Sequence, residues 1–158
     1  MAAMLMGAWS LQSCDNEPTK EVWLDEFGQD SCYVQDWGML EVNRSVVHTP
    51  LTVNGVVYER GLGAHSISRL LYDLDGKAVS ISGLAGADDK NLFAGKLQFK
   101  ILGDKKELWK SGVMQKGDPV KEFNVNLKGV DKVLLLVEEC GDGIMYAHAD
   151  WLNVKITT

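Results

Sequence analysis

The chain has 158 residues, of which 46% are hydrophobic, so it can bury one sizeable core and is too short for two ordinary domains. The formal charge of −6 comes from acidic residues spread along the chain, and no basic cluster is interleaved with aromatic residues, which excludes nucleic acid as an expected partner. A content of 16 glycines and 3 prolines favours many tight turns between short strands.

The N-terminal segment of residues 1–14 is uncharged, mostly small or apolar, and ends in Leu11-Gln12-Ser13-Cys14. It resembles the apolar part of a signal peptide followed by a bacterial lipobox, truncated at its basic start, and a frayed N-terminal extension is the alternative. Its apolar stretch of about 10 to 13 residues is too short for a permanent membrane span. We expect residues 15–21 to be a linker and the protein to be exported to the bacterial cell envelope, either secreted or bound to the membrane only through a lipid on Cys14.

Two further cysteines, Cys32 and Cys140, would then lie in a compartment that permits disulfides. The sequence leaves open whether they pair or remain free thiols, which behave as small apolar side chains.

From Glu21 onward the hydrophobic pattern almost nowhere keeps a helical period, so few helices are expected. The dipeptides Asn54-Gly55 and Asp75-Gly76 predict tight turns of the type found in hairpins. Alternation in residues 96–102 and 122–127 predicts half-buried strands, and the continuous apolar run of residues 132–138 predicts a central strand covered on both sides. Further strands are expected at residues 51–58, 70–74, 78–82 and 152–157. About nine short strands without crossover helices predict an all-β fold, an antiparallel β-sandwich.

Six blocks of residues match a known family pattern in order and spacing. They are residues 22–27; Trp37-Gly38 with residues 43–45 and 50–52; residues 58–66; residues 72–77 with 86–89; residues 108–113; and residues 141–144 with 148–151. The most specific block, residues 58–66, fits the pattern Tyr-x-(Lys/Arg)-Gly-Leu-Gly-x-His-(Ala/Ser).

On these residues the chain resembles the NPCBM family of carbohydrate-binding modules, also classed as CBM family 51, found appended to bacterial glycoside hydrolases such as alpha-galactosidases. The resemblance implies a jelly-roll, galactose-binding-domain-like sandwich over residues 22–158, with no catalytic activity and no required cofactor. Two features depart from the family pattern. Ala147 stands where the family usually has Asp, and Leu92-Phe93 is more apolar than its counterpart.

A sugar site needs an aromatic platform for the C–H face of the sugar and side chains that donate and accept hydrogen bonds. Trp37, between Asp36 and Gly38 outside any alternation, is expected to be that platform. The predicted sugar-binding residues are Trp37, Asn43, Arg44, His65, Tyr146, His148, Asp150 and Trp151. A place in the core is the alternative for Trp151, and His65 has the alternative role of satisfying buried backbone groups. The glycines before His65 are expected to let the backbone turn sharply.

Metal binding is predicted only for calcium, because the three histidines lie far apart and show no zinc-ligand spacing. Asp88, Asp89 and Asp142 lie in glycine-rich segments whose carbonyl oxygens could complete the ligand shell of a structural calcium ion. Ordinary solvated turn residues are the alternative.

Catalysis is not expected, because the chain has no Gly-x-Ser-x-Gly elbow and its adjacent acids, Asp88-Asp89 and Glu138-Glu139, point to opposite faces of a strand. A free-standing hydrolase with two converging carboxylates is therefore the weakest alternative. We expect a non-catalytic module that recognises terminal sugars of the galactose type on glycans and tethers or targets a glycoside hydrolase or cell surface. The alternative is a structural or protein-interaction domain of a surface complex that has lost sugar binding.

Overall fold

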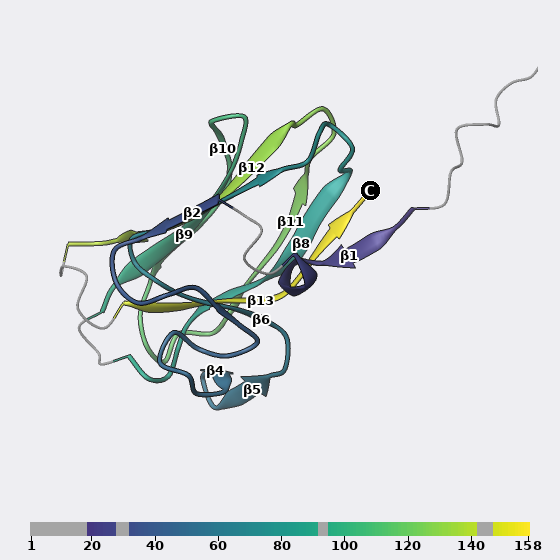
Figure 1. Cartoon of the computed structure of the whole chain (residues 1–158). Helices are drawn as coiled ribbons and strands as arrows, with labels where there is room; N and C mark the ends of the chain where they lie inside the picture. Colours follow the sequence, from purple (N-terminus) through teal and green to yellow (C-terminus); the bar gives the residue numbers. More distant parts are fainter. Residues whose placement is uncertain (1–18, 28–31, 92–94, 142–146) are drawn as a thin grey trace, which may run out of the picture.

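Two antiparallel β-sheets face each other across an apolar core, and a small hairpin lies outside one of them (Figure 1). The computed structural model describes residues 19–27, 32–91, 95–141 and 147–158. The predicted all-β sandwich is confirmed. Among the described residues, no helix is long and apolar enough to cross a membrane.

The first sheet has six strands. In spatial order they are β11 (Lys121–Asn126), β8 (Ser80–Ala87), β13 (His148–Thr157), β6 (Gly61–His65) and β3 (Glu41–Val42), with β1 (Glu21–Trp23) also pairing with β13. A single 3-10 turn, η2 (Leu24–Glu26), follows β1. The hairpin of β4 (Leu51–Val53) and β5 (Val56–Tyr58) lies outside this sheet.

The second sheet has five strands, in the order β10 (Lys106–Met114), β9 (Leu97–Gly103), β12 (Lys132–Glu139), β7 (Ser68–Asp73) and β2 (Cys32–Gln35). The apolar run of β12 therefore lies at the centre of its sheet, as predicted. Only its inner face is fully covered, because Leu134 on the outer face is partly exposed.

The core lies between the sheets and is built by alternation along the strands. Phe99 from β9 and Trp151 from β13 are fully buried and meet edge to face with ring centroids 4.9 Å apart. Burial of one such large apolar side chain contributes about 1.5–3 kcal/mol.

Strand β13 changes the face that it turns to the core. Ala149 and Trp151 point inward, but after an irregularity in the pairing between Leu152 and Lys155 the inward residues are Val154 and Ile156. Asn153 has a φ of 48° at this point, as expected for an inserted residue that shifts the alternation by one.

The predicted turns are confirmed, with one difference in what they connect. Asn54 and Gly55 have φ values of 51° and 80° and join β4 to β5. Asp75 and Gly76 also have positive φ values, 52° and 68°, but they lead from β7 in one sheet to β8 in the other, so this turn does not form a hairpin.

The first and last described segments of the chain pair with each other at one end of the sandwich. Lys20 and Thr158 exchange backbone hydrogen bonds of 3.2 and 2.8 Å, and β1 pairs with the end of β13. The last two residues of the predicted linker therefore belong to the fold. The predicted signal segment and Cys14 lie outside the described residues. Cys140 carries a free thiol.

Candidate functional site

Strand pairing places a row of polar side chains on the outer face of the six-stranded sheet. His148 of β13 lies opposite His65 of β6, and Asp150 lies between Gly63 of β6 and Gly86 of β8. Residues directly opposite each other share a face of the sheet. Since Ala149 and Trp151 point into the core, both histidines and Asp150 point outward.

Gly63 and Gly86 allow another part of the chain to lie directly on this face. A Cβ atom at Gly63 would meet the Arg44 carbonyl oxygen and come within 2.7 Å of the Ser45 Cα. At Gly86 it would come within 2.8 Å of a Val53 methyl group. Residues 44–53, here called the covering segment, therefore pack against the sheet. The run Gly61-Leu62-Gly63 is thus part of strand β6, whose outer face leaves space for the covering segment. It is not the sharp turn that we predicted.

The covering segment buries Asp150 completely. Among the described residues, no group donates a hydrogen bond to either of its carboxylate oxygens. Burial raises the pKa of Asp150 well above its ordinary value, and the neighbouring Asp88 carboxyl, which competes for the same proton, raises it further. Both effects favour the protonated, neutral form of Asp150, and its complete burial keeps it from reaching a sugar unless the covering segment moves.

His65 and His148 are buried side by side, with ring centroids 5.2 Å apart and exposures of 3% and 7%. Burial lowers the pKa of both imidazoles, and for His148 the proximity of His65 lowers it further. Both rings are therefore neutral. His65 Nδ1 lies 2.6 Å from the Ser66 carbonyl oxygen, which can only accept, so Nδ1 carries the proton and Nε2 keeps a lone pair.

Trp37 completes an aromatic cluster with these two histidines. Its ring centroid lies 5.1 Å from that of His65 and 6.0 Å from that of His148, and the side chain is 50% exposed. Gln35 holds it there, because its Nε2 donates to the Trp37 carbonyl and its Oε1 accepts from the His65 N–H. The aromatic cluster of Trp37, His65 and His148 thus combines an accessible ring with two neutral imidazoles.

Asn91 fixes the backbone of the cluster. Its Nδ2 donates to the His148 carbonyl at 2.7 Å, and its Oδ1 accepts from the His148 N–H at 2.6 Å. Asn91 is fully buried, so both bonds are shielded from water. Sequence reasoning missed Asn91 and Gln35, since neither belongs to a recognisable motif and each acts through backbone groups distant in the chain.

Other predicted site residues lie elsewhere. Trp151 is a correction: it is fully buried between Phe99 and Phe123, where no sugar can stack on it. Asn43 accepts from the Gly61 N–H at the opposite end of β6 from His65, roughly 13 Å away by the rise of a strand.

Arg44 is paired with Glu41, which also bonds His48, and no contact joins it to the aromatic cluster among the described residues. Tyr146 and Asp142 lie outside the described residues.

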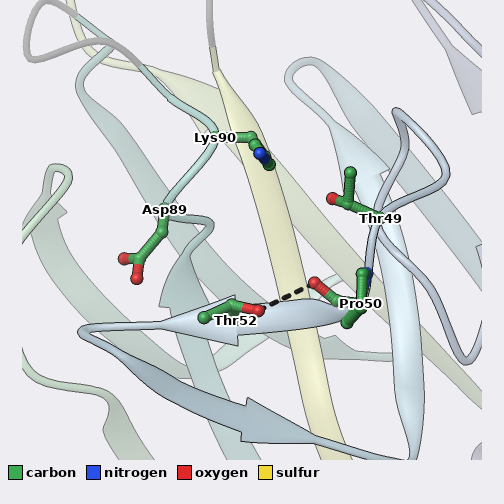
Figure 2. Close-up of a pocket in the computed structure, with 5 residues that line it drawn as sticks. All are labelled: Thr49, Pro50, Thr52, Asp89 and Lys90. Carbon is green, nitrogen blue, oxygen red and sulfur yellow. Dashed lines mark hydrogen bonds between the residues drawn. The ribbon is translucent and has the colours of Figure 1, made fainter.

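A hollow of about 340 Å³ opens beside the cluster, lined by Thr49, Pro50, Thr52, Asp89 and Lys90. Figure 2 shows Asp89 and Lys90 on one side of it and Thr49 and Pro50 on the other. The Asp89 carboxylate accepts the N–H groups of Asn54 and Gly55 at 2.8 and 2.9 Å, which caps the turn of the β4–β5 hairpin.

The predicted calcium ligands serve the fold as hydrogen-bond acceptors. Asp88 accepts from the Lys90 N–H at 2.9 Å, and Asp89 accepts from the hairpin turn. The described residues contain no group of three or more acidic, histidine or cysteine side chains that could hold a metal ion. Asp88 and Asp89 alone do not make a calcium site, and calcium stays a prediction.

The fold defines the class of protein, an antiparallel β-sandwich of two facing sheets. The chain belongs to the NPCBM/NEW2 domain family, whose sequence profile matches residues 20–157. It is a non-catalytic carbohydrate-binding module, and the predicted family is confirmed.

Two curated relatives are large enzymes. A Renibacterium salmoninarum protein, named as an endo-alpha-N-acetylgalactosaminidase, is 30% identical over 144 residues, which is 87% of this chain and 10% of the relative. Alpha-1,3-galactosidase B of Akkermansia muciniphila is 28% identical over 128 residues, or 78% of this chain and 16% of the relative. The chain thus spans between a tenth and a sixth of the length of these relatives.

Solved structures share the fold. The CBM51 module of Clostridium perfringens GH95, in complex with methyl-galactose, superposes with a TM-score of 0.79 at 23% identity, covering 87% of this chain and 99% of that one. The M60 catalytic domain with two CBM51 domains from Clostridium perfringens ZmpB matches with a TM-score of 0.78 at 28% identity, over 88% of this chain and 15% of that one.

Proposed function

We propose that the aromatic cluster of Trp37, His65 and His148 binds a terminal sugar of the galactose type, so that the module holds a glycoside hydrolase or a cell surface against a glycan. The observation that carries this proposal is the half-exposed Trp37 ring beside two neutral imidazoles. The relatives support the choice of sugar, since two are named for galactose-type substrates and a third was solved with methyl-galactose.

Each part of the cluster has a role that suits a neutral sugar. The Trp37 ring offers an apolar face to the C–H groups of the pyranose. His65 Nε2 can accept a hydrogen bond from a sugar hydroxyl, because the His65 proton lies on Nδ1. The neutral His148 ring packs beside it, with the two ring centroids 5.2 Å apart.

A shallow site of this kind is expected to bind one sugar with a Kd of ~0.1–1 mM, equivalent to ~4–5.5 kcal/mol. Attachment to a hydrolase or a membrane raises the effective concentration of the site without new contacts. Export and lipidation at Cys14 belong to the same proposal and rest on residues 1–14 of the sequence. Mass spectrometry of the protein from a bacterial membrane fraction would detect the lipid.

The experiment is a protein-detected NMR titration of the full chain with galactose, N-acetylgalactosamine, glucose and mannose, with and without calcium. Saturable shifts at Trp37, His65 and His148 for a galactose-type sugar are expected. Trp37→Ala should weaken binding at least about tenfold, or ~1.4 kcal/mol. The matched control is Val113→Ala, which also removes an exposed apolar side chain, 61% exposed on β10 of the other sheet.

A protein-interaction domain is the second candidate. The loop that carries Trp37 also exposes Met39, at 59%, and the covering segment exposes Val47, at 37%. These apolar side chains would suit a protein partner. A folded protein that shows no shift with any sugar would favour this candidate.

A further inference from the structure

The hollow beside the aromatic cluster has features of a second binding site. It lies between the covering segment, through Thr49, Pro50 and Thr52, and the turn that carries Asp89 and Lys90 (Figure 2). Lys90 directly precedes Asn91, whose side chain is bonded to both backbone groups of His148. Lys90 at the edge of the hollow is therefore next in the chain to Asn91, which fixes the backbone of His148 in the aromatic cluster.

The walls of the hollow are fixed by hydrogen bonds. The Asp89 N–H donates to the Thr52 carbonyl at 2.8 Å, and the Asp89 carboxylate is held by the hairpin turn. Ser45 Oγ and Thr49 Oγ1 lie 2.7 Å apart, which fixes the opposite wall. A ligand entering this space meets groups already in place, so little conformational entropy is lost on binding.

The hollow offers both kinds of hydrogen-bonding group. Lys90 is exposed and lines the hollow, and no ion pair or hydrogen bond of its ammonium group is seen within the described part of the chain. Its three N–H donors are therefore available to a ligand. Each Asp89 oxygen accepts one N–H and retains a further lone pair. The Pro50 ring adds an apolar wall.

Charge favours a neutral ligand. Asp89 and the adjacent Asp88 would repel an anion, and Lys90 would repel a cation, so neither sign has a net attraction here. Adjacent hydroxyl groups, which both donate and accept, match an ammonium beside a carboxylate, and the C–H face of a pyranose matches Pro50.

We propose that this hollow is a second sugar subsite, which binds the neutral sugar residue next to the terminal one, so that the module recognises an oligosaccharide. This inference rests on the proposed function of the aromatic cluster. Lys90 donates to one hydroxyl of the second sugar and Asp89 accepts from its neighbour. Lys90, which lines the hollow, and Asn91, which is bonded to His148, are adjacent in the chain, and adjacent residues of one glycan occupy the two subsites.

The test compares methyl galactoside with a panel of galactose-terminated disaccharides that covers the available linkages, using calorimetry on the full chain. At least one disaccharide should bind about fivefold to tenfold tighter than methyl galactoside, the effect of one or two net hydrogen bonds. Amide shifts at Thr49 and Thr52 should appear with that disaccharide and not with methyl galactoside.

Lys90→Gln should abolish this gain and leave the affinity for methyl galactoside unchanged. The matched control is Lys77→Gln, another exposed lysine, which lies on the turn between β7 and β8. If methyl galactoside binds but no disaccharide binds more tightly, or if the gain survives Lys90→Gln, the subsite is overturned and the proposed function stands. If methyl galactoside itself fails to bind, the proposed function is overturned.

Discussion

The outer faces of the two sheets differ sharply. The covering segment and the β4–β5 hairpin lie on the six-stranded sheet, where Leu51 and Val53 pack against Leu152 in a small second core. Over the described residues, no comparable segment is seen on the five-stranded sheet, whose outer face exposes Val34 at 57% and Leu71 at 36%.

The difference begins with side-chain size. On the six-stranded sheet, the positions that flank Asp150 are glycines, so a second layer of chain can approach the backbone. At the centre of the five-stranded sheet, Leu71, Leu134 and Lys100 fill the corresponding face. Lys100 there pairs with Glu138 and Glu107 at 3.0 and 3.6 Å. In this sheet, glycine in the middle of a strand thus marks the face where another segment of the chain packs and polar side chains are buried.

The largest expected effect comes from closing the space above Gly63. In Gly63→Ala the new methyl group would meet the backbone of Arg44 and Ser45, which cannot move aside as a flexible side chain can. We expect the free energy of unfolding to fall by about 3 kcal/mol or more, measured by urea denaturation. A loss below about 1 kcal/mol would show that the covering segment shifts easily and that the contrast between the faces is weak.

The next largest effect concerns the pH dependence of stability that arises from Asp150, the buried carboxyl beneath the covering segment. The pKa of Asp150 is raised in the folded state above its ordinary value of 3.8. At a pH between that ordinary value and the raised pKa, the folded protein therefore keeps a proton on Asp150 that the unfolded chain loses. The contribution of this carboxyl to the stability of the wild type is therefore fully present below that ordinary value, and it falls by up to about 1.4 kcal/mol per pH unit as pH rises toward the raised pKa.

Asp150→Asn keeps a neutral donor toward Asp88 and removes this pH dependence. We expect equal stabilities near pH 4 and a variant that becomes progressively more stable than the wild type at higher pH, measured by thermal unfolding in a series of buffers. The control is Glu59→Gln, an exposed acid whose replacement should not alter the pH profile. A variant less stable than the wild type at pH 8, together with stabilisation of the wild type by calcium, would instead mean that Asp150 is ionised and holds a cation.

A smaller effect concerns the histidines of the aromatic cluster. Their pKa values are lowered by burial, so the fold favours the neutral rings. That preference is fully present above about pH 6.5 and is lost as pH falls through the lowered pKa values. Sugar affinity should therefore fall severalfold between pH 7.5 and pH 5, measured by calorimetry. His48→Gln, which changes a histidine side chain 60% exposed, should keep the same profile. An unchanged affinity at pH 5 would remove the histidines from the site.

The smallest effect is expected on the outer face of the five-stranded sheet. Val34→Thr replaces an exposed side chain by one of similar shape, so the unfolding free energy should change by less than about 0.5 kcal/mol in the urea experiment used for Gly63→Ala. A loss above about 1 kcal/mol would show that this face is also covered in solution.

Much of the sandwich could be predicted from sequence because its strands alternate. The patterns of residues 96–102 and 122–127 predicted β9 and β11. Strands β8 and β13 were predicted too short, since their parts near the candidate site, such as residues 85–87, are buried on both faces and contain glycine in place of the usual alternation.

The site was less predictable for a related reason. Trp37 was predicted as a site residue from its lack of alternation, and the histidines from the family motif, and these assignments stay predictions. Trp151 and Asp150 are neighbours on one strand, and no sequence signal indicated which of the two side chains points into the core. The role of Asn91 depends on a contact 57 positions along the chain. Such contacts follow from the packing of β13 against the turn after β8, which local patterns do not contain.

The length of β13 also sets the distance between the aromatic cluster and the chain ends of the sandwich. The strand starts at His148 in the aromatic cluster and runs to Thr157, next to the Lys20–Thr158 pairing. Roughly 33 Å of extended backbone therefore separates the cluster from the point where both ends of the sandwich meet. Any flanking segments leave from neighbouring points at the far pole of the module (Figure 1). Under the proposed function, a domain attached at either chain end would therefore lie at the opposite pole from the aromatic cluster, and the sugar site would face away from it.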